Sequence, residues 1–145
     1  MKRSVTIVLL IVVIAAGLYA YKIYTGKVKS LEDAKADATV TATDLIAAFE
    51  KDSATANKQY LGKIVAVTGS IKSIEKESGS IVLGEEASMS SVRCSLDTNF
   101  VKKIAGLNLG NQITIKGACT GFNADELGLG SDVVLNRCVI PTNKN

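Results

Sequence analysis

The sequence contains no histidine, and it also lacks the short motifs that usually accompany catalysis. Histidine is the side chain whose ordinary pKa lies nearest neutral pH, so the chain has no ready general base. No G-x-S-x-G elbow, phosphate-binding P-loop or dinucleotide fingerprint is present. The sequence therefore predicts a protein that is not an enzyme and that needs no cofactor.

Metal ligands are equally scarce. The three cysteines show no C-x-x-C spacing, and without histidine a zinc shell would have to recruit distant carboxylates. Asp125, Glu126 and Asp132 flank a glycine-rich loop, but their spacing matches no calcium-binding loop. Solvated surface acids are the better interpretation, and we predict no metal site.

A long uncharged run occurs only at the beginning of the chain. Residues 4–21 carry no charge and are mostly apolar. A helix over these residues would be about 27 Å long, close to the hydrocarbon thickness of a bilayer. Tyrosines near its end lie where interfacial aromatic residues are found, at Tyr19, Tyr21 and Tyr24. The sequence predicts a single-pass signal-anchor helix within residues 1–24, so that residues 4–21 contact the membrane.

A cleaved signal peptide is the alternative to this anchor. Ala15-Ala16-Gly17 could serve as a cleavage site, which would remove residues 1–17. No cysteine follows the run, so the usual bacterial lipoprotein attachment is absent. Basic residues flank both ends of the run, but the very short N-terminal tail and the cysteine-containing domain favour one orientation. We expect a cytoplasmic N-terminus and an extracytoplasmic domain, either periplasmic or extracellular.

The overall charge of +3 has a different meaning once the chain is divided. Residues 1–29 hold five of the 17 basic residues and no acid, which leaves 12 basic residues against all 14 acidic ones. The basic surplus therefore belongs to the membrane flanks, where it can contact lipid headgroups. The remaining domain has a net charge of −2 and no basic surplus that would attract a polyanion. Nucleic acid is therefore not expected as a partner.

The organisation after the anchor follows from composition and periodicity. Residues 25–43 are rich in Lys, Asp, Ala and Thr and predict a stem or linker. A helix capped by Thr43 or Asp44 then continues to Tyr60, and the folded domain spans residues 44–141, followed by a polar tail over 142–145. The apolar side of this helix consists of Leu45, Ile46, Phe49, Ala56 and Tyr60.

After Leu61-Gly62 the apolar period changes to two, which is typical of half-buried strands. A short helix over residues 99–105, closed by Gly106, interrupts the strands after the third. The predicted strands cover residues 63–74, 80–83, 89–96, 112–119 and 132–140.

Three strands, a helix and two strands is the element order of the OB-fold. We therefore predict a mainly β protein, a five-stranded OB-type Greek-key barrel with a preceding helix and a short helix between the third and fourth strands, plus an N-terminal transmembrane helix. The chain resembles the tRNA_anti-like family of bacterial OB-fold proteins in four segments within residues 44–140. These are AAFEKDSATANKQYLGKIVAVTGSI, VRCSL, ITIKGACTG and DVVLNRCVI. The resemblance rests on Tyr60-Leu61-Gly62-Lys63, on Gly117 with Cys119 and on Leu135 with Cys138. It implies an OB-fold, frequent membrane or lipid anchoring, and no assigned function.

The cysteines Cys94, Cys119 and Cys138 occupy inward positions of the predicted strands. In an OB barrel the last strand lies between the third and fourth, so Cys94 and Cys138 can be neighbours, whereas Cys119 lies about 17 to 20 Å from Cys138. We predict Cys94 with Cys138 as a possible disulfide. Three reduced thiols in the core are nearly as well supported, because free cysteine packs as a small apolar residue.

For function, the sequence predicts a binding or scaffold module for a protein, peptide or glycan ligand. OB-folds usually bind ligands on the face of the second and third strands and on the adjoining loops. The ligand-binding candidates at these positions are Arg93, Lys76, Phe122 and Asn123. The alternative is a single-stranded nucleic-acid binding protein. That alternative is disfavoured because the same face offers no aromatic ring on which bases could stack, with Phe122 the only aromatic residue expected to be exposed.

Overall fold

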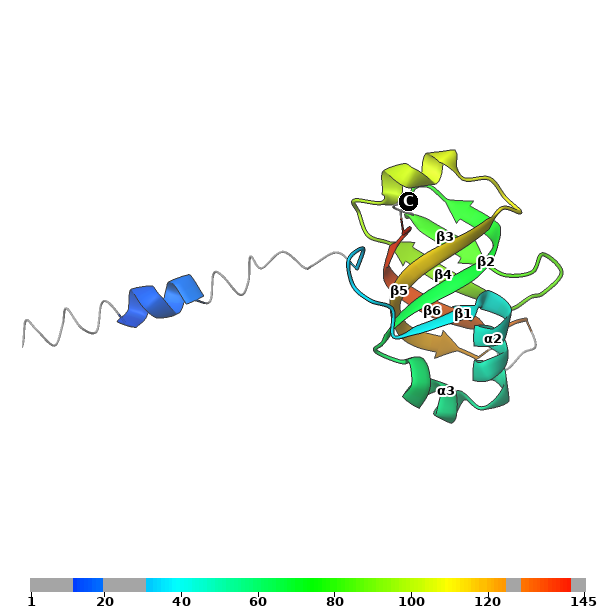
Figure 1. Cartoon of the computed structure of the whole chain (residues 1–145), viewed down its shortest axis with the longest axis horizontal. Helices are drawn as coiled ribbons and strands as arrows, with labels where there is room; N and C mark the ends of the chain where they lie inside the picture. Colours follow the sequence, from blue (N-terminus) through cyan, green and yellow to red (C-terminus); the bar gives the residue numbers. More distant parts are fainter. Residues whose placement is uncertain (1–11, 20–30, 125–128, 142–145) are drawn as a thin grey trace, which may run out of the picture.

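The computed structural model describes residues 12–19, 31–124 and 129–141. Its centre is a closed β-barrel in which the strand order is β2-β3-β4-β6-β5, and β5 returns to pair with β2 (Figure 1). This is the predicted OB-type arrangement. The strands are β2 (Ile64–Glu75), β3 (Ser80–Leu83), β4 (Ser91–Leu96), β5 (Gln112–Asn123) and β6 (Asp132–Val139).

The long strand β2 closes the barrel because its two halves have different partners. Residues 64–70 pair antiparallel with β5, and residues 71–75 pair antiparallel with β3 across an irregularity between Ile71 and Ser73. A single chain segment thus joins two edges of the sheet. The remaining seam is formed by β4 and β6, which run parallel, with Cys94 opposite Leu135.

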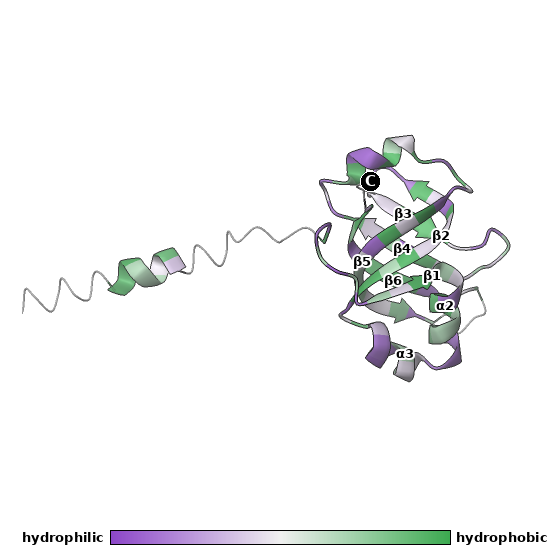
Figure 2. Ribbon diagram, viewed as in Figure 1, coloured by the Kyte–Doolittle hydropathy of each residue, from purple (hydrophilic) through white to green (hydrophobic). Residues whose placement is uncertain are grey.

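Alternate residues of each strand fill the barrel. Val65, Val67, Ile115 and Leu135 are completely buried, as the period-two pattern predicts. Hydrophobic residues follow the barrel strands in Figure 2, while hydrophilic ones gather on helix α3 (Ser53–Tyr60) and on part of the 3₁₀ helix η1 (Val101–Gly106). Apolar side chains therefore fill the interior of the barrel.

Two helices replace the single helix predicted after residue 43. Helix α2 (Ala42–Lys51) begins one residue after Thr41, whose hydroxyl accepts a hydrogen bond from the Asp44 N–H. The backbone then leaves helical geometry at Asp52, with φ −157° and ψ 89°, and the Asp52 carboxylate caps α3 (Ser53–Tyr60) by accepting from the Thr55 N–H. The apolar face was predicted correctly, since all five of its residues are buried. Its division into two helices follows from the capping preference of Asp52, which stops one helix and starts the next.

The stem was expected to end at residue 43, but the structure packs residues 31–41 onto the barrel. Strand β1 (Ala38–Thr41) pairs parallel with β2, Ala38 opposite Val65, and adds a sixth strand to the sheet. Leu31 is buried against Phe100 and Val139. A Thr-Val-Thr stretch is too short to show strand periodicity alone, and the exposed backbone of β2 provides the partner that stabilises it.

The short helix predicted over residues 99–105 between β4 and β5 is present as the 3₁₀ helix η1, at Val101–Gly106. Its N-cap residue is Phe100, with no side-chain hydrogen bond, while the Asp97 carboxylate accepts from the Asn99 N–H in the preceding turn. Phe100 and Ile104 are buried as the shared-face pattern predicts.

Residues 12–19 form a short helix. None of the helices within the described ranges is both long enough and apolar enough to cross a membrane. Most of the predicted anchor, at residues 1–11 and 20–24, lies outside the described residues, as do the tail over 142–145 and residues 125–128 of the β5–β6 loop.

Candidate ligand-binding face

A groove of about 410 Å³ runs over the outer face of β2, β3 and β4 and ends at the β5–β6 loop. Cross-strand register places Ser73, Val82, Arg93 and Val134 in one row across this face. The barrel closure thus brings together residues that are far apart in the sequence. The groove is lined by Lys72, Ser73, Glu75, Val82, Met89, Ser91, Arg93, Leu129, Gly130 and Asp132.

An ion pair between Arg93 and Asp132 lies at the centre of the groove. The Nε of Arg93 donates to Oδ2 of Asp132 at 2.8 Å, and the side chains are 50% and 26% exposed. The hydroxyl of Ser91 donates to the other carboxylate oxygen. Ser91 lies directly opposite Asp132 in the parallel β4–β6 register, so the two strands hold this arrangement.

The electrostatics of the pair keep both groups charged. Partial burial by itself would raise the pKa of Asp132, but hydrogen bonds from Ser91 and Arg93 and the charges of Arg93 and Lys72 outweigh it and lower that pKa. The hydrogen bond and charge of Asp132 raise the pKa of Arg93. The groove therefore contains two cations, Lys72 and Arg93, and two carboxylates, Glu75 and Asp132, with no net charge.

The loops at the rim of the groove are tied to the barrel and to each other. Lys72 donates to the Ser88 carbonyl, which holds the β3–β4 loop over β2. Ser90 donates to Glu50 of α2 at 2.6 Å and accepts from the Ser131 N–H at 3.0 Å, which connects this loop to the start of β6. Gly130, at φ +102°, lies against the Met89 backbone, where a Cβ would be only 2.4 Å away. The walls of the groove are thus formed before any ligand arrives.

The predicted site residues do not gather in one place. Arg93 lines the groove, and Asn123 is exposed beside it, opposite Asp132 in the β5–β6 register. Lys76 is exposed in the β2–β3 turn and is not among the lining residues. Phe122 was expected to be exposed, but its ring stacks on Phe49 with centroids 4.9 Å apart and packs on the core.

Sequence reasoning did not place Lys72, Met89 or Asp132 at the site. Asp132 appeared only as a surface acid beside a loop. The signal that could have identified it is its position at the first residue of a strand that must lie next to β4 in an OB barrel. Arg93 then has an acid within reach across the seam.

Aromatic side chains are absent from the groove. Phe49, Tyr60 and Phe100 are buried, and Phe122 is half-buried on Phe49. Within residues 31–124 and 129–141 the barrel therefore offers no exposed ring on which a base could stack.

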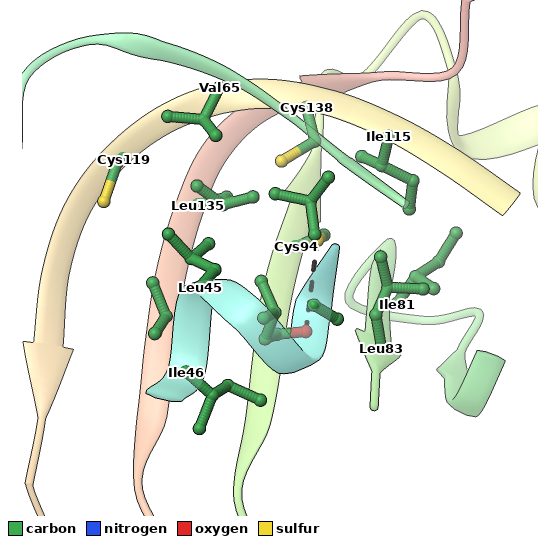
Figure 3. Close-up of a cluster of buried hydrophobic side chains, with 14 of the residues drawn as sticks. Leu45, Ile46, Val65, Ile81, Leu83, Cys94, Ile115, Cys119, Leu135 and Cys138 are labelled. Atoms are coloured by element: carbon green, nitrogen blue, oxygen red, sulfur yellow. Dashed lines mark hydrogen bonds between the residues drawn. The ribbon is translucent and has the colours of Figure 1, made fainter. Parts of the chain in front are cut away.

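All three cysteines are free and buried. Cys94 and Cys138 are neighbours in the core, and Cys119 lies apart from them (Figure 3). The β4–β6 register places Leu135 opposite Cys94 and Leu96 opposite Cys138, with an irregularity between them. The structure holds the two thiols of the predicted pair in contact and reduced.

The cysteines have the properties of structural residues. Contact with the Cys138 thiol and complete burial raise the pKa of Cys94 well above its usual value. Burial also raises the pKa of Cys119. A thiol whose pKa is raised forms little thiolate at neutral pH and reacts slowly. Across the described ranges no group of three His, Cys, Asp or Glu side chains is arranged to hold a metal ion.

Sequence comparison identifies the family. The tRNA_anti-like model matches residues 1–139. The chain belongs to the tRNA_anti-like family. A search of curated proteins finds no relative of the chain.

One solved structure shares the fold of this tRNA_anti-like protein. A "putative nucleic acid-binding lipoprotein" from Klebsiella pneumoniae is 18% identical, with a TM-score of 0.51, covering 71% of this chain and 91% of that one. A "putative aspartyl-tRNA synthetase" from Leishmania major is 7% identical, with a TM-score of 0.43, covering 81% of this chain and 23% of that one. The first likeness shows a shared fold, and the second is too distant to carry any argument.

Proposed function

We propose that this tRNA_anti-like protein is a non-catalytic binding or scaffold module, anchored in the membrane by residues 4–21 and exposed outside the cytoplasm. Its ligand is a protein, peptide or glycan that binds in the groove over β2, β3 and β4. The observation that carries the proposal is the preformed groove, whose positive and negative charges balance. Hydrogen bonds already join the loops at its rim to α2 and to the start of β6.

Two features support a role without catalysis. The chain has no histidine, and the central Arg93–Asp132 pair consists of groups that remain charged at neutral pH. A general acid or base works best when its pKa lies near the working pH, and neither member of this pair meets that condition. The Ser91 hydroxyl donates to the same carboxylate, whose lowered pKa makes it a weak base.

Membrane anchoring is supported by the sequence rather than by a described helix. The uncharged run over residues 4–21 has the length of a bilayer span. The Klebsiella pneumoniae structure is named a lipoprotein, which is consistent with a membrane-associated role for this chain. We infer that the barrel is held beside the membrane and that the groove acts there.

Nucleic-acid binding is the second candidate, because the structural neighbour carries that description in its name. Nucleic-acid OB-folds combine a cationic groove with stacking rings. Here the cations of the groove are matched by Glu75 and Asp132, and the rings are packed inside. The name of the structural neighbour is therefore a reason to test nucleic-acid binding. The residues of the groove favour a protein, peptide or glycan ligand instead.

The proposal is tested with the full-length chain in detergent micelles, applied to peptide and glycan arrays. We expect binding that Met89→Asp weakens about tenfold or more, because Met89 lines the groove and is 67% exposed. Leu109→Asp is the matched control, since Leu109 is 65% exposed and lies outside this groove. Equal effects of the two changes, or no bound probe on either array, would contradict the proposal.

The same preparation tests the nucleic-acid candidate with fluorescent single-stranded RNA and DNA. We expect no retention at low salt. Retention that falls steeply as salt rises would replace the proposal with the second candidate, because counterion release makes phosphate binding strongly salt-dependent.

A further inference from the structure

The terminal nitrogens of Arg93 have no partner in the described parts of the chain. Arg93 donates to Asp132 through Nε, and half of its side-chain surface is exposed. The planar guanidinium donates two parallel hydrogen bonds well to a carboxylate. We propose that Arg93 is the anchor for a carboxylate carried by an extended peptide, an inference that rests on the proposed binding function.

The anchor is held in place before the ligand binds. Asp132 accepts from both Ser91 and Arg93, and Ser91 is 4% exposed, so the ion pair rests on a buried hydroxyl. Lys72 fixes the adjoining loop through the Ser88 carbonyl. A guanidinium whose direction is already set loses less conformational entropy when a ligand binds.

The balance of charge selects a single carboxylate over a polyanion. Asp132 and Glu75 offset Arg93 and Lys72, and Glu75 is near enough to act on Arg93 electrostatically. Long-range attraction for a phosphate backbone is therefore weak. A single carboxylate gains mainly from the two short hydrogen bonds to Arg93, which depend on geometry rather than on net charge.

The surroundings of Arg93 fit a peptide with an apolar residue beside the carboxylate. Val82 pairs with Arg93 in the β3–β4 register and forms an apolar floor at 8% exposure. Met89 and Leu129 are 67% and 65% exposed at the rim, and methionine adapts readily to side chains of different shape. The volume of about 410 Å³ is within the range of sites that hold small ligands or short segments.

The carboxylate can come from a peptide C-terminus or from an acidic side chain, and the probes separate these sources. The full-length chain in micelles is applied to an array of peptides with every pair of C-terminal residues. Each peptide is made with a free carboxylate, with an amidated end, and with an amidated end plus one internal glutamate. We expect the best peptides to lose about tenfold or more in affinity on amidation. Recovery of affinity with the internal glutamate identifies a side-chain source, and no recovery identifies the C-terminus.

Variants separate failure of this inference from failure of the proposed function. Arg93→Gln is expected to abolish the preference for a carboxylate, and Arg93→Lys to retain only part of it, because lysine lacks the planar pair of donors. Lys102→Gln is the control, since it removes one positive charge from the exposed surface of η1. Groove-dependent binding of amidated peptides without an acidic side chain that is as tight as binding of their free-carboxylate forms overturns the inference alone. Equal effects of Arg93→Gln and Lys102→Gln on binding have the same consequence. If no peptide binds in any of the three forms, both the Arg93 inference and the proposal of a peptide ligand are overturned.

Discussion

At the residue scale, Gly117 shows how tightly the cysteine region of the core is packed. A Cβ added at Gly117 would lie 2.4 Å from Cys138 Sγ and 3.3 Å from the Leu135 Cβ. The Cys138 thiol therefore occupies the space that a side chain on β5 would take, and it meets Cys94 there. The glycine is required by this close approach, since its φ is not in the left-handed region.

Gly117→Ala is predicted to destabilise the barrel by about 1–3 kcal/mol, because the added methyl overpacks the core. Thermal unfolding of the full-length chain in micelles, followed by circular dichroism, measures the change. Gly121→Ala is the control on the same strand, since nothing lies within 4 Å of its added Cβ. Adding Cys138→Ala to Gly117→Ala is expected to restore part of the loss. If the two glycine variants unfold alike, the packing argument is wrong.

At the scale of elements, the stem is fastened to the barrel by a buried lysine. Lys116 of β5 is 8% exposed, and its Nζ donates to the carbonyls of Glu32 and Ala34 at 2.7 and 2.6 Å. Asp37 and Ile64 exchange two further bonds, from the Asp37 N–H to the Ile64 carbonyl and from the Ile64 N–H to the Asp37 carboxylate. These contacts make residues 31–37 part of the folded domain rather than a flexible linker.

Lys116→Met is predicted to release this segment, because methionine keeps the apolar stem of the side chain but cannot donate to the two carbonyls. The expected cost is about 1–3 kcal/mol. Hydrogen exchange read by mass spectrometry should show faster exchange in residues 31–37 and little change in the barrel core. Lys102→Met, at an exposed position, should leave both regions unchanged. Unaltered exchange in residues 31–37 of Lys116→Met would show that the lysine does not hold the segment.

At the scale of the whole molecule, the stem and the groove lie at opposite ends of β6. Leu31 packs on Val139, at the end of the strand, while Asp132 begins it in the groove. Seven steps of about 3.3 Å separate these ends, roughly 23 Å. The stem joins the barrel on one side, and the β3–β4 loop projects on the other (Figure 1). Leu31, where the described barrel segment begins, is therefore remote from the groove along β6.

For the proposed anchor, the full-length chain is predicted to remain with membranes through an alkaline wash and to be released by detergent. Deleting residues 4–21 should move the barrel to the soluble fraction, since these residues supply the apolar span. Leu61→Arg is the control, because Leu61 is an exposed residue in the turn between α3 and β2, and this variant should stay in the membrane. Mass spectrometry of the native chain decides the alternative, since a soluble product that begins near residue 18 would mean a cleaved signal peptide.

Much of the barrel could be predicted because burial in a strand depends on local alternation. Val65, Val67 and Ile71 follow this rule and lie in the core, and the short strand over residues 80–83 was predicted with its observed bounds. The helix break at Asp52 was missed because its apolar face continues across it. Phe122 was misplaced because its exposure depends on Phe49, a residue far from it in the sequence.

The sequence by itself determined which residues are apolar, where strands alternate and in what order they follow, and these local properties are sufficient for the OB-type barrel. Only the tertiary structure decided that β1 joins the sheet and that Arg93 pairs with Asp132. Each of these depends on the register of strands that are distant in the chain. A shift by one residue would turn every side chain to the other face, and only the packing of the closed barrel excludes that shift.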